Sequence, residues 1–132
     1  MPRLVKGGKW TWGWVVVGPS REVMIPPDAW REYGFQTGQE AIFTPGSQRS
    51  GGFGISTLHL MAHFAGKTGG APMRELGRSV FGSGAVHLTP GVGVEPGARL
   101  LTVRGSCSAL GFVARGPIHE EARRHPELKV FR

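Results

Sequence analysis

The chain has 132 residues, 39% of them hydrophobic, and a formal net charge of +7. This length suits one compact domain or two very small ones. The single cysteine, Cys107, excludes an intrachain disulfide framework and a zinc site built from several cysteines. The longest apolar run, residues 14–17, is too short to cross a bilayer, and residues 1–8 lack the apolar stretch of a signal peptide. We therefore expect a cytoplasmic protein without a membrane partner.

The basic residues are unevenly distributed along the chain. Residues 1–66 carry six Lys and Arg against four Asp and Glu, whereas residues 67–132 carry ten against five. A chain with this excess of positive charge favours a polyanion as its partner.

The first predicted strand is rich in tryptophan. Trp10, Trp12 and Trp14 alternate with Thr11 and Gly13, and this period of two predicts a strand with three indoles on one face. Such a face can stack nucleic-acid bases, or it can form part of a core or a subunit interface. The core or interface interpretation is favoured, because large rings are usually buried.

A second strand, residues 23–25, ends at the Pro26-Pro27 pair. Proline suits the first turn of a helix, where its missing N–H is not needed, so a helix of about two turns is expected next. Gly34 should end this helix because glycine readily adopts positive φ. The turn at residues 36–39 then leads into a strand at residues 40–44.

The middle of the chain contains a polar loop, residues 45–52, and a predicted strand over residues 53–60. His59 and His63 have the i, i+4 spacing of a metal-binding pair. However, Leu60 stands where a zincin helix has its glutamate, and a strand would separate the two rings. No metal or cofactor is therefore expected.

A sequence pattern in the first half of the chain recurs in the second half. Residues 21–27 and 84–90 each read as a strand followed by a proline, and each is followed by a glycine, then x-x-x-Gly, then a strand. The second copy has lost about one helical turn between these anchors. Repeated supersecondary units usually bury their apolar faces against each other.

The end of the chain predicts a hairpin and one more helix. Residues 100–103 and 109–114 read as two strands of a hairpin. A short helix then starts at Gly116-Pro117 and continues to Arg124, and Pro126 stops it.

The series Val-Met-Ile-Pro at residues 23–26, Tyr-Gly-Phe at 33–35, Gly38 and Ala-Ile-Phe at 41–43 resembles the AbrB/MazE-like (SpoVT–AbrB) swapped-hairpin family. The family pattern is V-x-I-P, a short helix, L-G-hydrophobic-x-x-G-D and a strand. The resemblance covers residues 14–57 well and residues 80–116 more weakly.

The resemblance implies a mainly β protein: a small swapped-hairpin β-barrel built from two repeats, with short helices. The implied organisation is repeat 1 at residues 1–57, a connector at 58–79, a degenerate repeat 2 at 80–116 and a C-terminal helix and tail at 117–132. The two copies would either close one barrel within the chain, as a pseudo-dimer, or pair with those of a second chain in a homodimer.

The family usually binds DNA, and five basic residues are the candidate phosphate contacts: Lys6, Lys9, Arg21, Arg49 and Arg78. Members commonly carry a Gly-Arg pair immediately before V-x-I-P, and its arginine is associated with DNA contact. Here Arg-Glu and Gly-Ala stand at those positions in the two copies, residues 21–22 and 84–85. A glutamate at the arginine position repels phosphate. The resemblance therefore supports the fold more strongly than the DNA contacts.

The sequence thus predicts an AbrB-like transcriptional regulator or antitoxin-type repressor that binds double-stranded DNA. The alternative is a protein-interaction module on the same fold that has lost its DNA contacts and binds a protein partner. A third possibility, an enzyme or small-ligand binder, lacks a convincing constellation of acid, base and nucleophile, so no enzymatic activity is predicted.

Overall fold

Strands make up most of the regular structure, as predicted. The computed structural model describes residues 10–46, 51–64, 74–104 and 109–132. In chain order its elements are β1 (Thr11–Val16), β2 (Glu22–Met24), α1 (Pro27–Tyr33), β3 (Glu40–Pro45), β4 (Phe53–Ser56), α2 (Leu58–Phe64), β5 (Gly77–Val80), β6 (Ala85–His87), the 3-10 turn η2 (Pro90–Val92), β7 (Arg99–Arg104), β8 (Leu110–Val113), α3 (Pro117–Ala122) and β9 (Val130–Phe131).

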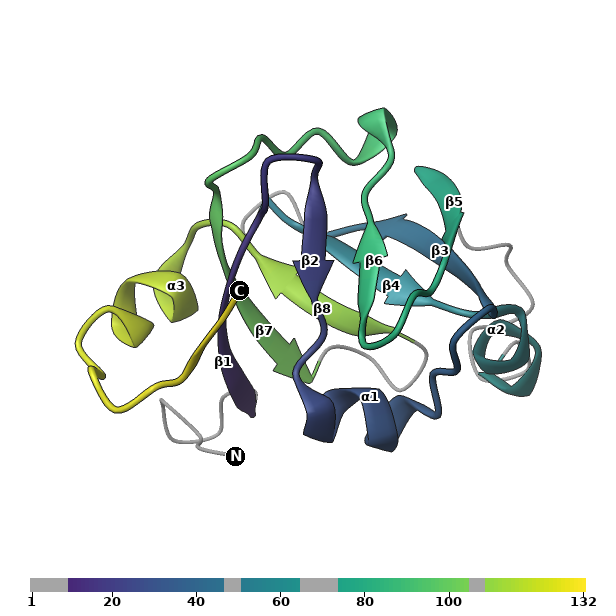
Figure 1. Ribbon diagram of the computed structural model, residues 1–132. Helices are drawn as coiled ribbons and strands as arrows, with labels where there is room; N and C mark the ends of the chain where they lie inside the picture. The colour runs from purple at the N-terminus through teal and green to yellow at the C-terminus, as the bar shows by residue number, and fades with distance from the viewer. Residues whose placement is uncertain (1–9, 47–50, 65–73, 105–108) are drawn as a thin grey trace.

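The strands form two sheets. The larger has seven strands in the order β5-β3-β4-β8-β7-β1-β9 and is mixed, because β9 runs parallel to β1. The smaller sheet is the antiparallel pair β2-β6, which lies in front of the larger sheet in Figure 1. The larger sheet is open, with β5 and β9 at its two edges, and does not close into a barrel.

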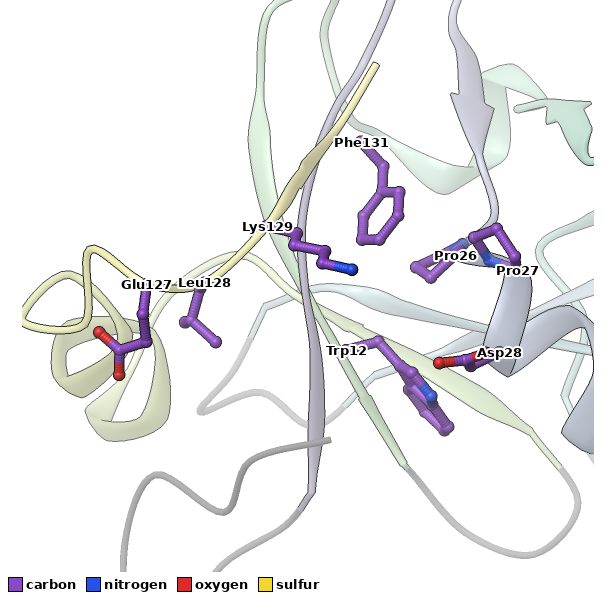
Figure 2. A pocket seen from close by; sticks show the side chains of 8 residues that line it. All are labelled: Trp12, Pro26, Pro27, Asp28, Glu127, Leu128, Lys129 and Phe131. Atoms are coloured by element: carbon purple, nitrogen blue, oxygen red, sulfur yellow. The ribbon is translucent and has the colours of Figure 1, made fainter.

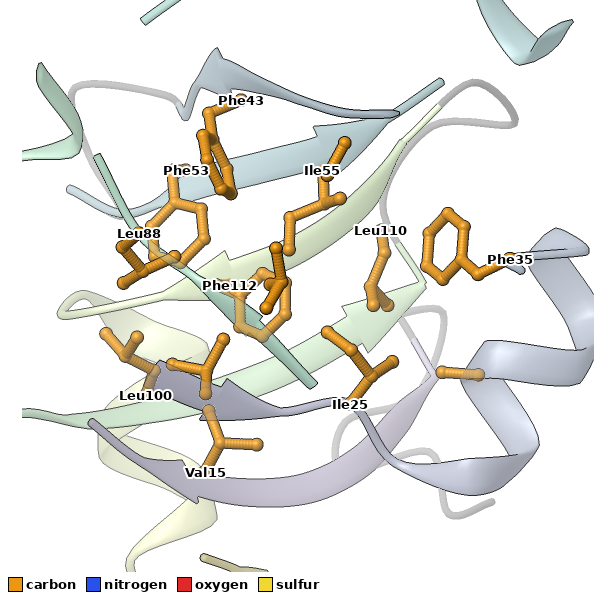
Figure 3. Close-up of a cluster of buried hydrophobic side chains, with 14 of the residues drawn as sticks. Val15, Ile25, Phe35, Phe43, Phe53, Ile55, Leu88, Leu100, Leu110 and Phe112 are labelled. Atoms are coloured by element: carbon orange, nitrogen blue, oxygen red, sulfur yellow. The ribbon is translucent and has the colours of Figure 1, made fainter. Parts of the chain in front are cut away.

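The main core lies between the two sheets. It joins side chains of the large sheet to those of β2, β6 and α1, and Figure 3 shows these rings and aliphatic groups pointing toward one another. Phe53 stacks on Phe112 with ring centroids 4.7 Å apart. A second, smaller cluster lies on the other face of the large sheet, where Leu101 and Val103 pack against α3. Burial of apolar surface holds the layers together and contributes a free energy of about 25 cal/mol for each Å² removed from water.

Several elements lie where the residues at their ends predicted them. Helix α1 begins with Pro27 at its first turn and ends at Gly34, which has the left-handed φ of 69°. The second copy retains only the η2 turn, ended by Gly93 at φ 74°. The hairpin β7–β8 and the helix α3 also lie where the sequence predicts them.

The strand predicted over residues 53–60 is wrong beyond Ser56. Strand β4 ends there, and α2 begins at Leu58. Thr57 starts the helix: its Oγ1 accepts the amide of Leu60 at 3.2 Å, and its carbonyl accepts the amide of Met61 at 3.0 Å. A threonine that caps the first turn in this way offsets the strand preference of the preceding residues.

The prediction that the tryptophans share one face is also wrong. Register shifts between Thr11 and Gly13, so that Trp12 is an extra residue opposite β7. Such a bulge reverses the alternation of side chains along the strand. As a result Trp12 lies in the main core and Trp14 in the cluster beneath α3, with 9% and 4% of their surfaces exposed. Both are buried, as the core interpretation expects.

The two copies have the same hydrogen-bond register. The β3–β4 hairpin pairs Thr44 with Gly54, and the β7–β8 hairpin pairs Val103 with Gly111. β5, most of which falls in the predicted connector (residues 58–79), is the counterpart of β1 and forms the first strand of the second copy. Each copy's strands then pair with those of the other copy: β1 with β7, β5 with β3, β2 with β6, and β4 with β8. When the copies are exchanged, the β1–β7 pair becomes the β5–β3 pair, whereas the β2–β6 and β4–β8 pairs each become themselves.

In two places, equivalent residues of the two copies lie directly opposite each other. Val23 lies opposite Val86 in the small sheet, and Gly54 lies opposite Gly111 in the large sheet. A pseudo-twofold axis through these pairs relates one copy to the other. Backbone bonds outside the strands obey it too, since the amide of Gly38 donates to Phe81 at 2.8 Å and the amide of Gly97 donates to Val17 at 2.7 Å.

The C-terminal strand breaks this symmetry. β9 adds to the free edge of β1, where Trp14 pairs with Val130 and the amide of Trp14 donates to the carbonyl of Lys129 at 2.8 Å. Gly13 permits this approach, because a Cβ at that position would lie 2.5 Å from the Lys129 oxygen. The corresponding edge of β5 carries no further strand in the described part of the chain.

Candidate functional site

Three of the five predicted phosphate contacts, Lys6, Lys9 and Arg49, lie outside the described residues. The other two, Arg21 and Arg78, occupy different elements. Arg21 lies in the turn between β1 and β2, and Arg78 lies on the edge strand β5.

Arg21 has an uncommon backbone conformation and an acidic partner. Its φ is 60°, a left-handed value that takes it out of the strand alternation assumed from the sequence. Its Nη2 donates to Oε2 of Glu95 at 3.3 Å, and 40% of its side chain is exposed. Glu95 therefore offsets part of the positive charge that a phosphate would meet.

Arg78 is held by two carboxylates. Its Nη1 donates to Glu40 at 2.7 Å, and its Nε donates to Glu75 at 2.9 Å. The hydrogen bond from Arg78 lowers the pKa of Glu75, and the bonds to Glu75 and then Glu40 raise the pKa of Arg78. Two negative charges surround one guanidinium, so Arg78 presents no net positive charge to a polyanion.

Other cations, which the sequence did not single out, line a cavity beneath α3. This cavity has a volume of about 420 Å³ and is lined by Trp14, Arg99, His119, Ala122, Arg123, His125, Pro126, Leu128 and Val130. In the described part of the chain, neither Arg99 nor Arg123 makes a salt bridge. β1 and β7 supply its floor, while α3 and the tail that follows supply its walls.

Arg99, Trp14 and His119 contact one another within this cavity. The guanidinium carbon of Arg99 lies 4.9 Å from the centroid of the Trp14 ring, and the His119 ring meets that indole edge-on with centroids 4.9 Å apart. Nε2 of His119 lies 3.2 Å from the Arg99 carbonyl oxygen. Since a carbonyl can only accept, Nε2 carries the hydrogen, and this bond fixes the orientation of a ring that is 5% exposed.

His125 stands at the mouth of the cavity with two carboxylates. Its Nδ1 lies 2.7 Å from Glu127 Oε1, and its Nε2 lies 3.3 Å from Glu121 Oε1. The hydrogen bond to Glu127, followed by that to Glu121, raises the pKa of His125 above its ordinary value. The charge of a protonated His125 is therefore already matched within the protein.

A second cavity of about 420 Å³ lies on the opposite side of the C-terminal tail (Figure 2). Its lining residues are Trp12, Pro26, Pro27, Asp28, Glu127, Leu128, Lys129 and Phe131. Figure 2 shows Lys129 extending from the tail toward the start of α1, and the Trp12 ring lying below it. Leu128 lines both cavities, so the tail is the partition between them. Charges of both signs line this cavity, in contrast to the one beneath α3.

The internal repeat relates the β7–β1 strand pair beneath the basic cavity to the β3–β5 pair. In the shared register, Arg99 of β7 corresponds to Glu40 of β3, and Trp14 of β1 corresponds to Arg78 of β5. The β3–β5 strand pair thus has a glutamate–arginine ion pair where the related β7–β1 pair has an arginine over an indole. The doubled pattern in the sequence aligned Glu40 with Arg99, and this was the signal that could have identified Arg99.

The histidine pair of α2 differs from its prediction. Because residues 58–64 are helical, the rings of His59 and His63 stack with centroids 6.4 Å apart instead of being separated by a strand. No group of three or more potential ligands surrounds them among the described residues.

No helix in the described ranges is both long and apolar enough to span a membrane. In comparisons with known proteins, the chain has no significant match to a family model, a curated protein or a solved structure.

Proposed function

We propose that the two copies constitute a swapped-hairpin unit of the AbrB-like kind, contained in one chain, and that this unit binds double-stranded DNA as a transcriptional regulator or repressor. The reciprocal strand pairing carries the proposal. Each copy's first strand, β1 or β5, pairs with the third strand of the other copy, β7 or β3. This exchange is the arrangement that the resemblance to the family implies.

The pseudo-twofold axis supports a DNA partner. Dimeric regulators use two-fold symmetry to contact two half-sites of a duplex, and a chain with an internal repeat presents such paired surfaces without a second subunit. The formal charge of +7 supplies the attraction to phosphate. Because Arg21 and Arg78 are ion-paired, we assign the main phosphate contacts to Lys6, Lys9 and Arg49.

Salt dependence of duplex binding tests the proposal. Fluorescence anisotropy of a labelled pool of genomic fragments should show affinity that falls with a log–log slope of about −0.9 for each phosphate neutralised. The variant Lys6→Gln/Lys9→Gln/Arg49→Gln should reduce the steepness by up to about 2.7. Arg31→Gln is the matched control, since Arg31 is exposed but already bonded to Asp28. Absence of binding at low salt would refute the proposal.

A protein-interaction module on the same fold is the second candidate. Two observations favour it: the described candidate arginines are neutralised, and the edge strand β5 exposes 59% of Val80. A stoichiometric partner that co-purifies with the chain, and that Val80→Lys releases, would favour this role. A homogeneous protein that binds DNA but no partner would exclude it.

A further inference from the structure

The cavity beneath α3 brings together two arginines that have no carboxylate partner in the described part of the chain. Several other arginines are paired: Arg21 meets Glu95, Arg31 meets Asp28, Arg104 meets Glu32, and Arg124 meets Glu121. Arg99 and Arg123 line the cavity without a salt bridge in the described part of the chain. Two guanidinium groups facing one hollow repel each other unless an anion lies between them.

We propose that this cavity is a binding site for a small phosphate-bearing ligand, whose phosphate is held by Arg99 and Arg123. A guanidinium offers several N–H donors in a planar fork, which suits two oxygens of one phosphate. The two arginines differ from the residues to which the DNA contacts are assigned, Lys6, Lys9 and Arg49.

The cavity is built to hold Arg99 in place. The Trp14 ring supports its guanidinium at 4.9 Å, and the buried His119 is bonded to its backbone carbonyl. A side chain restrained in this way loses less conformational entropy when it binds an anion. His125 contributes less, because Glu121 and Glu127 already accept its hydrogen bonds.

The size and lining of the cavity fit a small organic phosphate. Its volume of about 420 Å³ lies in the range of small-molecule sites. The charged groups Arg99 and Arg123 are exposed, whereas Ala122 and Leu128 are buried. The phosphate would therefore lie at the mouth, and the apolar part of the ligand would lie on the inner wall.

The related position at the β3–β5 strand pair provides the internal comparison. There Glu40 replaces the arginine and its carboxylate accepts from Arg78 at 2.7 Å. An anion entering that position would face the charge of Glu40 and would have to displace it from Arg78. The ligand is thus expected at the β7–β1 strand pair and not at the β3–β5 pair.

Calorimetric titration of the full chain with inorganic phosphate and with pyrophosphate, at fixed ionic strength, tests the site. Arg99→Gln and Arg123→Gln should each weaken binding by about tenfold to a hundredfold, as expected for loss of a charge-assisted hydrogen bond. Arg124→Gln is the matched control, because it removes the same charge from the next residue, which is paired with Glu121. It should change affinity by less than about threefold, the size of an exposed electrostatic effect.

Both arginines are exposed, so these variants should fold, and unchanged thermal unfolding would verify this. Equal weakening by Arg123→Gln and Arg124→Gln would indicate diffuse attraction and overturn the proposal. Failure of both phosphate probes to bind the wild-type chain would also overturn it.

Duplex DNA binding of the same variants identifies the source of the phosphate. Affinity for DNA that is unchanged in Arg99→Gln and Arg123→Gln supports a free small ligand. A parallel loss of DNA and phosphate binding places a backbone phosphate of DNA in the cavity and overturns the small-ligand assignment. Phosphate binding by a chain that binds no DNA would refute the proposed function and leave this site standing.

Discussion

Arg99 lies over the indole of Trp14, with its guanidinium carbon 4.9 Å from the ring centroid. The positions that the repeat relates to them hold Glu40 and Arg78, joined at 2.7 Å. Of the two related strand pairs, β3–β5 thus carries a closed ion pair and β7–β1 carries a cation without a carboxylate. Since internal repeats keep the backbone pairing while their side chains diverge, a binding site can arise at one strand pair without disturbing the fold.

We predict that removing the carboxylates around Arg78 creates a new phosphate contact. In Glu40→Gln/Glu75→Gln the guanidinium loses both acidic partners, so duplex affinity should rise and the log–log salt slope should steepen by about one. Anisotropy measures both quantities. Adding Arg78→Gln should abolish the gain; a gain that persists in this triple variant would mean that total charge, and not Arg78, is responsible.

Gly13→Ala should detach the C-terminal strand. A Cβ there would lie 2.5 Å from the Lys129 carbonyl, and Gly13 has a φ of 131°. We expect a loss of about 1–3 kcal/mol in the free energy of unfolding and faster hydrogen exchange at the Trp14 amide, which donates to Lys129.

Gly38→Ala controls for backbone strain, because Gly38 has a φ of 87° but nothing within 4 Å of its would-be Cβ. It should destabilise the fold without exposing the Trp14 amide. Equal exchange of that amide in the two variants would show that the contact with Lys129 does not anchor β9.

Val23→Thr should destabilise the layer between the sheets. Val23 is fully buried opposite Val86, and threonine has nearly the same shape but adds a hydroxyl to an apolar core. The expected cost is about 1–3 kcal/mol, measured by urea unfolding. Met24→Thr, at a neighbouring position that is 38% exposed, should cost less than about 1 kcal/mol. Similar costs for both would contradict the position of β2 over the core.

The tail after α3 should loosen as the pH rises. The hydrogen bonds to Glu127 and Glu121 raise the pKa of His125 above its ordinary value of 6.5. The stability that His125 contributes to the tail is therefore fully present below pH 6.5 and is lost as the pH rises through the raised pKa. The pKa of Glu127 is lowered, first by a hydrogen bond from the backbone amide of Glu127 and then by the one from His125. At acid pH, the stability that Glu127 contributes is therefore lost only as the pH falls through that lowered pKa.

Carboxypeptidase digestion of the tail at about pH 5.5 and about pH 8 would detect this loosening, together with an NMR titration of the His125 ring. His125→Asn should make digestion at the two pH values similar after correction for the activity of the protease. Equal protection of the wild-type tail at both values would contradict the prediction.

Local chemistry was sufficient where an element depends on its own residues. Pro27 and Gly34 set the ends of α1, and the apolar run at residues 100–103 was sufficient to predict β7. The bulge at Trp12 could not be predicted in this way, because it depends on the register with β7 and on the approach of Lys129 to Gly13. Helix α2 was not predicted because the residues before it favour a strand, whereas its start depends on the cap at Thr57.

The sequence alone determined the ends of α1, the β7–β8 hairpin and the doubled pattern, because turns and caps depend on neighbouring residues. Tertiary structure decided which charges remain available. Arg21 meets Glu95 and Arg78 meets Glu40 across 74 and 38 positions of sequence, and Arg99 lies over Trp14, a residue from another strand. Electrostatic availability depends on distance in space, so a basic sequence predicts a polyanion partner, while only the fold shows which arginines are free to meet it.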